Sequence, residues 1–89
     1  MARYDAHSRD FVALAAEAGM PDALFELGLM YCSGRGVSVD LVEAHKWFNL
    51  AAARGNDDAR RYRSEISREL NRAEISDAQR RARAWLGRA

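Results

Sequence analysis

A spacing of 36 residues relates two stretches of this 89-residue chain. The segment LAAEAG at residues 14–19 recurs as LAAARG at residues 50–55. The same shift relates Phe11 to Trp47, Asp22 to Asp58 and Ala23 to Ala59. A fixed period of this length is typical of stacked helical repeats, in which each unit buries its apolar face only against its neighbours. Such a chain offers a surface for binding more often than a pocket for catalysis.

The composition limits the chain to one small helical domain, expected to cover residues 1–89. Hydrophobic residues make up 48% of the sequence and proline occurs once, which is ample for a folded helical core. The lone Cys32 excludes an intramolecular disulfide. No stretch approaches the ~20 consecutive apolar residues of a membrane span, and the first residues carry no signal-peptide pattern. We therefore expect an all-α cytoplasmic protein without a membrane partner.

Helix start and stop signals divide the chain into five expected helices. The first covers about residues 8–18 and ends at Gly19, since glycine tolerates the left-handed conformation common just past a helix. Pro21 then begins a second helix at about residues 21–33, because proline is favoured in the first turn. The apolar face predicted for the first helix consists of Phe11, Leu14, Ala15 and Ala18.

Two capping patterns place the later helices. Asp40, followed three residues later by Glu43, predicts a capping box at the start of a third helix. A fourth helix is expected at about residues 57–71, and Ser76 with Gln79 predicts a capping box for the last one. The apolar stripes of these helices are Ala44, Trp47, Phe48 and Ala51; then Ala59, Tyr62, Ile66 and Leu70; and finally Ala78, Ala82, Trp85 and Leu86.

Residues 23–55 carry a specific signature of small, aromatic and turn-forming residues. Its positions are Ala23, Leu27, Gly28, Tyr31, Gly34, Gly36, Asp40, Ala44, Trp47, Ala51, Ala52 and Gly55. This pattern resembles the Sel-one-like repeat, a relative of the tetratricopeptide repeat. The resemblance implies a short right-handed α-solenoid of antiparallel helix pairs, an α-α superhelix of about five helices.

The signature positions also have a physical interpretation. Gly28 lacks a side chain where the third helix must approach closely, and the glycines of the loop permit a sharp turn. Ala44 and Ala51 supply small residues opposite, with Trp47 filling the space between them.

The resemblance reaches from about residue 8 to residue 70, but one unit alone is complete. We expect a half repeat at residues 8–19, a complete repeat at 21–55, a degenerate repeat at 57–71 and a C-terminal capping helix at 76–88. In the degenerate unit, Arg63 and Ser67 stand where the complete one has Leu27 and Tyr31. Because so few repeats leave apolar surface at the ends of the array, the end helices or a second copy must cover it.

The second helix is expected to be apolar on two sides. Besides its signature residues it carries Phe25, Leu29 and Cys32, at spacings of four and three. Two interpretations are open: neighbouring helices of the same chain cover this stripe, or it forms a groove for a partner helix or a second copy. We therefore name Phe25, Leu29 and Cys32 as candidate protein-binding residues.

The sequence carries no recognisable catalytic motif. Cys32 and two scattered histidines do not make a four-ligand metal site, and no motif places a base beside this thiol. The Gly34–Gly36 segment lacks the lysine of a phosphate-binding loop. We expect a non-enzymatic protein–protein interaction module or scaffold that binds a protein or peptide along its helical face, with no catalytic residues, metal or cofactor.

The charge distribution leaves two alternatives open. Residues 1–58 carry five basic and nine acidic side chains, whereas residues 59–89 carry nine arginines and four acidic residues. Opposite charges at the two ends favour self-association, such as a homodimer. Arg80, Arg81 and Arg83 would be the groups to contact phosphates, but no aromatic residues lie between them for base stacking, so nucleic acid is the weaker alternative.

Overall fold

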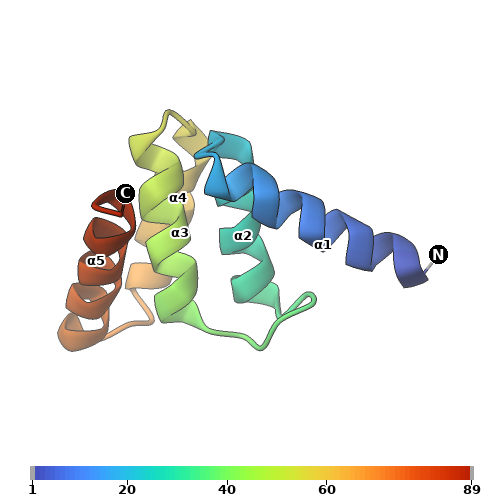
Figure 1. Cartoon of the computed structure of the whole chain (residues 1–89). Helices are drawn as coiled ribbons and strands as arrows, with labels where there is room; N and C mark the ends of the chain where they lie inside the picture. The colour runs from blue at the N-terminus through green and yellow to red at the C-terminus, as the bar shows by residue number, and fades with distance from the viewer. Residues whose placement is uncertain (1, 89) are drawn as a thin grey trace.

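The computed structural model describes residues 2–88, which form five α-helices and, within that range, no strand; residues 1 and 89, the ends of the predicted domain, lie outside it. Figure 1 shows α3 at the centre of the bundle, antiparallel to α2, while α1 leaves the bundle and points away. This is the expected all-α, solenoid-like arrangement of helix pairs. The helices are α1 (Ala2–Glu17), α2 (Pro21–Ser33), α3 (Leu41–Ala53), α4 (Asp57–Ser67) and α5 (Arg72–Leu86).

The boundary between α1 and α2 follows the predicted signals. Gly19 has a φ of +78°, and its N–H donates to the carbonyl of Ala16 at 2.8 Å, which closes α1. Pro21 is the first residue of α2, as expected. The start of α1 was predicted at about residue 8 and is wrong, because the helix already begins at Ala2, ahead of the apolar face on which the prediction relied.

The start of α3 confirms Asp40 as its N-cap but corrects the predicted capping box. The Asp40 carboxylate accepts the backbone N–H of Glu43 at 3.0 Å. In a complete capping box the Glu43 carboxylate would accept the backbone N–H of Asp40. Here it accepts hydrogen bonds from Lys46 at 2.9 Å and Arg81 at 2.8 Å instead. One half of the box therefore fixes the helix end, and the other half is used to hold α5.

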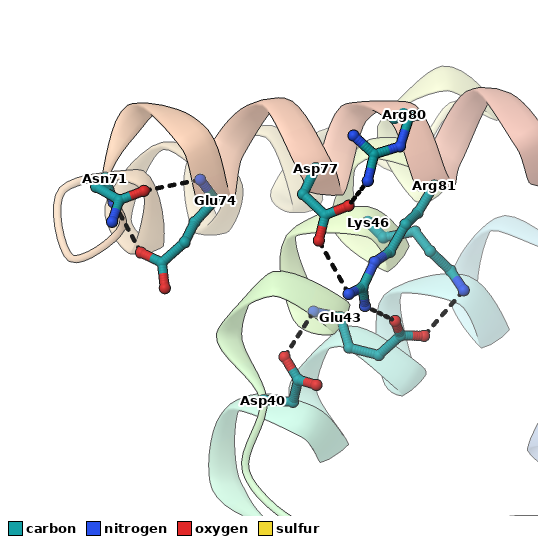
Figure 2. Close-up of polar contacts among 8 residues, drawn as sticks. All are labelled: Asp40, Glu43, Lys46, Asn71, Glu74, Asp77, Arg80 and Arg81. Atoms are coloured by element: carbon teal, nitrogen blue, oxygen red, sulfur yellow. Dashed lines mark hydrogen bonds and ion pairs between the residues drawn. The ribbon is translucent and has the colours of Figure 1, made fainter.

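The capping box predicted at Ser76 is wrong, because the N-cap of α5 is Asn71, five residues earlier. The Asn71 side chain accepts the N–H of Glu74 at 2.8 Å, and the Glu74 carboxylate accepts the N–H of Asn71 at 2.9 Å (Figure 2). Compared with α2 and its loop, α4 is two residues shorter and the following connection three residues shorter. The starts of α2 and α4 are thus 36 residues apart, but the N-caps of α3 and α5, Asp40 and Asn71, are only 31 residues apart.

The core lies where α3 packs against α2. The largest fully buried side chains are Phe48, Leu24 and Leu50. Gly28 makes the close approach possible, because a Cβ there would lie 2.3 Å from the Phe48 ring. Phe48 therefore occupies the position that the sequence assigned to Trp47, which instead lies half-buried with its ring centroid 6.2 Å from that of Trp85 in an edge-to-face contact.

Polar contacts join α3 to α4, the helix of the degenerate repeat. His45 is 2% exposed, and its Nε2 lies 3.0 Å from Ser67 Oγ. Because Ser67 Oγ itself donates to the carbonyl of Arg63 at 2.8 Å, the histidine ring is the donor in the first bond. Arg63 also donates to Asn49 Oδ1 at 2.6 Å. The residues that depart from the repeat signature thus replace apolar contacts with specific hydrogen bonds.

A network of charged side chains holds α5 against α3 (Figure 2). Arg81 bridges the two helices, donating to Glu43 at 2.8 Å and to Asp77 at 2.9 Å. Asp77 also pairs with Arg80, and Glu43 with Lys46. The hydrogen bond that Arg81 donates to the Glu43 carboxylate raises the pKa of Arg81 above its ordinary value. Beneath this network Ala78 and Ala82 are fully buried, and their small size lets the helices approach closely.

Candidate protein-binding surface

The apolar stripe predicted on α2 lies largely against the rest of the chain. The Phe25 ring centroid is 5.2 Å from that of Tyr62 on α4 and 5.7 Å from that of Phe48 on α3. Phe25, Leu29 and Cys32 are all half-buried and pack against the core cluster. Neighbouring helices of the same chain therefore contact this stripe, which is the first of the two interpretations left open by the sequence.

Cys32 lies in surroundings that keep its thiol protonated. Burial, and to a lesser extent the charge of Glu69, raises the pKa of Cys32 above its ordinary value. A protonated thiol is a poor nucleophile. Across the described residues, no three His, Cys, Asp or Glu side chains gather into a group that would hold a metal ion.

The repeat-signature residues lie in or against the core and at the turns and helix ends. Gly28, Ala44 and Ala51 are buried, while Ala23, Leu27, Tyr31, Trp47 and Ala52 are half-buried and pack against the core. Gly34, Gly36 and Gly55 have positive φ angles at the two turns, and Asp40 is an N-cap. Burial and the nearby Glu43 and Asp40 carboxylates raise the pKa of Tyr31.

Among the described side chains of α1, the large apolar Phe11 and Leu14 are exposed, and the exposed Ala18 follows just past the end of the helix. We call these three residues the α1 stripe. Phe11 is 74% exposed and Leu14 is 73% exposed, whereas the small Ala16 is the buried residue of this segment. The apolar face predicted for the first helix is therefore exposed except at Ala15, which is half-buried. The positions 36 residues later behave differently, because Trp47 is half-buried and Leu50 is 1% exposed.

The difference arises from the neighbours of the two helices. α3 packs against α2, α4 and α5, and Trp47 has the Trp85 ring beside it. α1 packs against α2 and then runs away from the bundle (Figure 1). The same repeat positions are thus covered in the middle of the array and open at its N-terminal end.

The α1 stripe continues into a pocket of about 420 Å³ at the C-terminal ends of α1, α3 and α5. Ala18 belongs to both, since it lies one helical turn beyond Leu14 and also lines the pocket. The pocket is lined by Glu17, Ala18, Gly19, Arg54, Trp85, Leu86 and Arg88. No sequence signal pointed to this pocket, because its residues come from three turns far apart in the chain.

Two guanidinium groups flank Trp85 in the pocket. Arg88 lies 3.9 Å from the ring centroid and donates to Glu17 Oε1 at 2.5 Å and to the Glu17 carbonyl at 2.9 Å. Arg54 lies 5.9 Å from the same centroid. Its guanidinium lies close to Gly19, because a Cβ on residue 19 would be 2.8 Å from Arg54 Nη1.

The fold and these surfaces define a helical-repeat protein of the α-solenoid class, with exposed apolar helix surface at one end. Residues 21–56 match the family model of the Sel1 repeat. The chain thus carries a Sel1 repeat over these residues, nearly the same range as the complete repeat that the sequence predicts at residues 21–55.

Two curated proteins are similar to this chain over most of its length. The chitin synthase regulator SKT5 of Saccharomyces cerevisiae is 40% identical over 65 residues, which is 73% of this chain and 9% of that protein. The alginate biosynthesis protein AlgK of Azotobacter vinelandii is 32% identical over 71 residues, which is 80% of this chain and 15% of that protein. The chain therefore spans a small part of the length of these relatives.

The match to the Sel1 repeat indicates the general kind of function. Sel1 repeats are generally protein-interaction modules and are typically non-catalytic. The described helices include none that is both long enough and apolar enough to cross a bilayer.

Proposed function

We propose that this chain is a non-enzymatic interaction module that binds a helical segment of another protein along the α1 stripe. The observation that carries the proposal is the contrast between equivalent repeat positions. Phe11 and Leu14 are 74% and 73% exposed, while Leu50 is 1% exposed and Trp47 is half-buried. Contiguous exposed apolar side chains of this size are typical of a binding surface.

The expected occupant is an amphipathic helix. Residues 11, 14 and 18 have the spacing of one helix face, and a helix laid along them would meet apolar side chains at each turn. In the body of the molecule a helix, α5, packs against the equivalent face of α3. A partner helix on α1 would therefore repeat a contact that the fold already makes once.

The α2 stripe is a second candidate contact within this proposal. Leu29 and Cys32 retain part of their exposure, while Phe25 is held by its two aromatic neighbours. The cytoplasmic location expected from the sequence remains a prediction.

Self-association is the second candidate function, because a second copy could cover the same α1 stripe. In a symmetric dimer, two identical stripes would pair with each other. Binding of nucleic acid stays the weaker alternative, since Arg61, Arg80, Arg81 and Arg88 all lie in ion pairs with carboxylates.

The test compares capture of partner proteins from native extract by the wild type and by a Phe11→Ser/Leu14→Ser double variant. A Val39→Ser variant is the matched control, since Val39 is 60% exposed but lies in the α2–α3 loop. We expect the double variant to lose the proteins that wild type and control both retain, with unchanged circular dichroism. Equal capture by all three proteins would contradict the proposal. Light scattering that shows a dimer in wild type and a monomer in the double variant would instead establish self-association.

A further inference from the structure

Among the described side chains, no carboxylate forms an ion pair with Arg54. It follows the last residue of α3 and lines the pocket beside the α1 stripe. The ion pairs among the described side chains, residues 10–88, include Arg88 with Glu17 in the same pocket but none with Arg54. The pocket is therefore lined by one guanidinium, that of Arg54, which has no ion-pair partner among these side chains.

The position of this guanidinium is prepared by its surroundings. Gly19 leaves the room that Arg54 occupies, and the turn at Gly19 has a φ of +78° that other residues rarely adopt. On the other side stands Trp85, whose ring is fixed by the edge-to-face contact with Trp47 and by Arg88 at 3.9 Å.

The chemistry of the pocket indicates a carboxylate. Its other guanidinium, Arg88, already binds a carboxylate, donating to Glu17 Oε1 at 2.5 Å. The planar guanidinium fork can bind both oxygens of a carboxylate. Glu17 is itself occupied by Arg88, which leaves Arg54 to an external group.

The pocket also lies where the end of a bound helix would arrive. Ala18 is the last residue of the α1 stripe and lines the pocket together with Arg54. Resting on the function proposed above, we propose that Arg54 binds a carboxylate at the end of the partner helix that lies on the α1 stripe. The carboxylate comes from the C-terminus of the partner or from an Asp or Glu side chain near the end of its helix.

Three twelve-residue acetylated helical peptides of leucine, alanine and glutamine test this assignment. The first ends in a free carboxylate, the second in an amide, and the third is the amide with glutamate in its last turn. Binding is measured by fluorescence anisotropy and by the NMR shift of the Trp85 indole N–H. We expect at least one acidic peptide to bind about tenfold more tightly than the neutral amide, the size of one charge-assisted contact. The acidic peptide whose affinity exceeds that of the neutral amide identifies the source of the carboxylate.

The variants decide whether Arg54 is responsible. Arg54→Gln should bind all three peptides equally, whereas Arg60→Gln should keep the preference, because Arg60 is exposed on α4 and does not line the pocket. A preference that survives Arg54→Gln, equal binding of the three peptides by wild type, or no binding of any peptide at millimolar concentration would each overturn the assignment. The capture experiment with the Phe11→Ser/Leu14→Ser variant is scored separately, so loss of the carboxylate preference alone leaves the α1 interaction standing.

Discussion

The two end helices of this molecule, α1 and α5, are attached to the repeat in opposite ways. α5 packs along α3 through the fully buried Ala78 and Ala82. α1 packs against α2 near its C-terminal end and leaves Phe11 and Leu14 exposed. Large apolar side chains of α1 are thus exposed, whereas α5 packs through small buried ones. The contrast indicates that α5 closes one end of the array and that the end at α1 is open.

The polar contacts of the two ends follow the same division. Arg81 joins α5 to Glu43, whose side chain is 18% exposed, and shares a network with Asp77. α1 has the pair of Glu17 and Arg88, with side chains 65% and 38% exposed. Exposed ion pairs contribute little to the free energy of folding. Breaking the pair of Glu17 and Arg88 therefore costs little free energy.

Replacing one aromatic residue at each end is expected to give the largest difference. Trp85→Ala removes the edge-to-face contact with Trp47 and should lower the free energy of unfolding by about 2 kcal/mol. Phe11→Ala, at 74% exposure, should change it by less than about 0.5 kcal/mol. Urea denaturation followed by circular dichroism measures both. Equal losses for the two variants would show that α1 is as integral to the fold as α5.

Removing one charge at each end should give a smaller difference in the same direction. Glu43→Gln weakens the bonds to Arg81 and Lys46 and should cost about 1 kcal/mol, after allowance for the partial exposure of Arg81. Arg88→Gln, which breaks the exposed pair with Glu17, should cost at most about 0.5 kcal/mol. The free energy of unfolding of each variant at low salt checks this order, and a larger loss for Arg88→Gln would reverse the comparison.

Acidification should weaken the body of the molecule through His45. Burial, and then the charge of Arg63, lowers the folded-state pKa of His45 below the ordinary value of 6.5. Below about pH 6.5 the unfolded chain therefore binds more protons than the folded one, and the free energy of unfolding falls as the pH drops toward the folded-state pKa. Urea denaturation at pH 7.5 and 5.5 should show this fall in wild type and a smaller one in His45→Gln. The same pH dependence in both proteins would assign it to other groups.

Much of the fold could be predicted because local signals decide it. Pro21 and Asp40 start helices where the sequence indicates, and Gly19 ends α1 with its positive φ. The start of α5 was missed because Ser76 with Gln79 fits the capping pattern, while Asn71 and Glu74 form the actual capping box. The same pattern occurs twice within a few residues, and the tertiary structure decides which one caps the helix.

The candidate site was harder to predict because burial depends on packing between distant segments. The sequence left open whether Phe25 of α2 is covered within the chain, and the structure places Tyr62 of α4 and Phe48 of α3 against it. Phe11 had the spacing of a core residue, but no helix of the described chain covers it. Helical spacing identifies apolar faces, and the neighbours that decide their exposure come from the tertiary structure.

Native-state amide hydrogen exchange tests the central claim that α1 is an open end of the repeat and α5 a closed one. We expect the amides of residues 8–15 to exchange through local opening, with protection well below that of residues 76–84 in α5. The latter should exchange mainly through global unfolding, because their helix packs along α3. Protection of α1 equal to that of α5 would contradict this account.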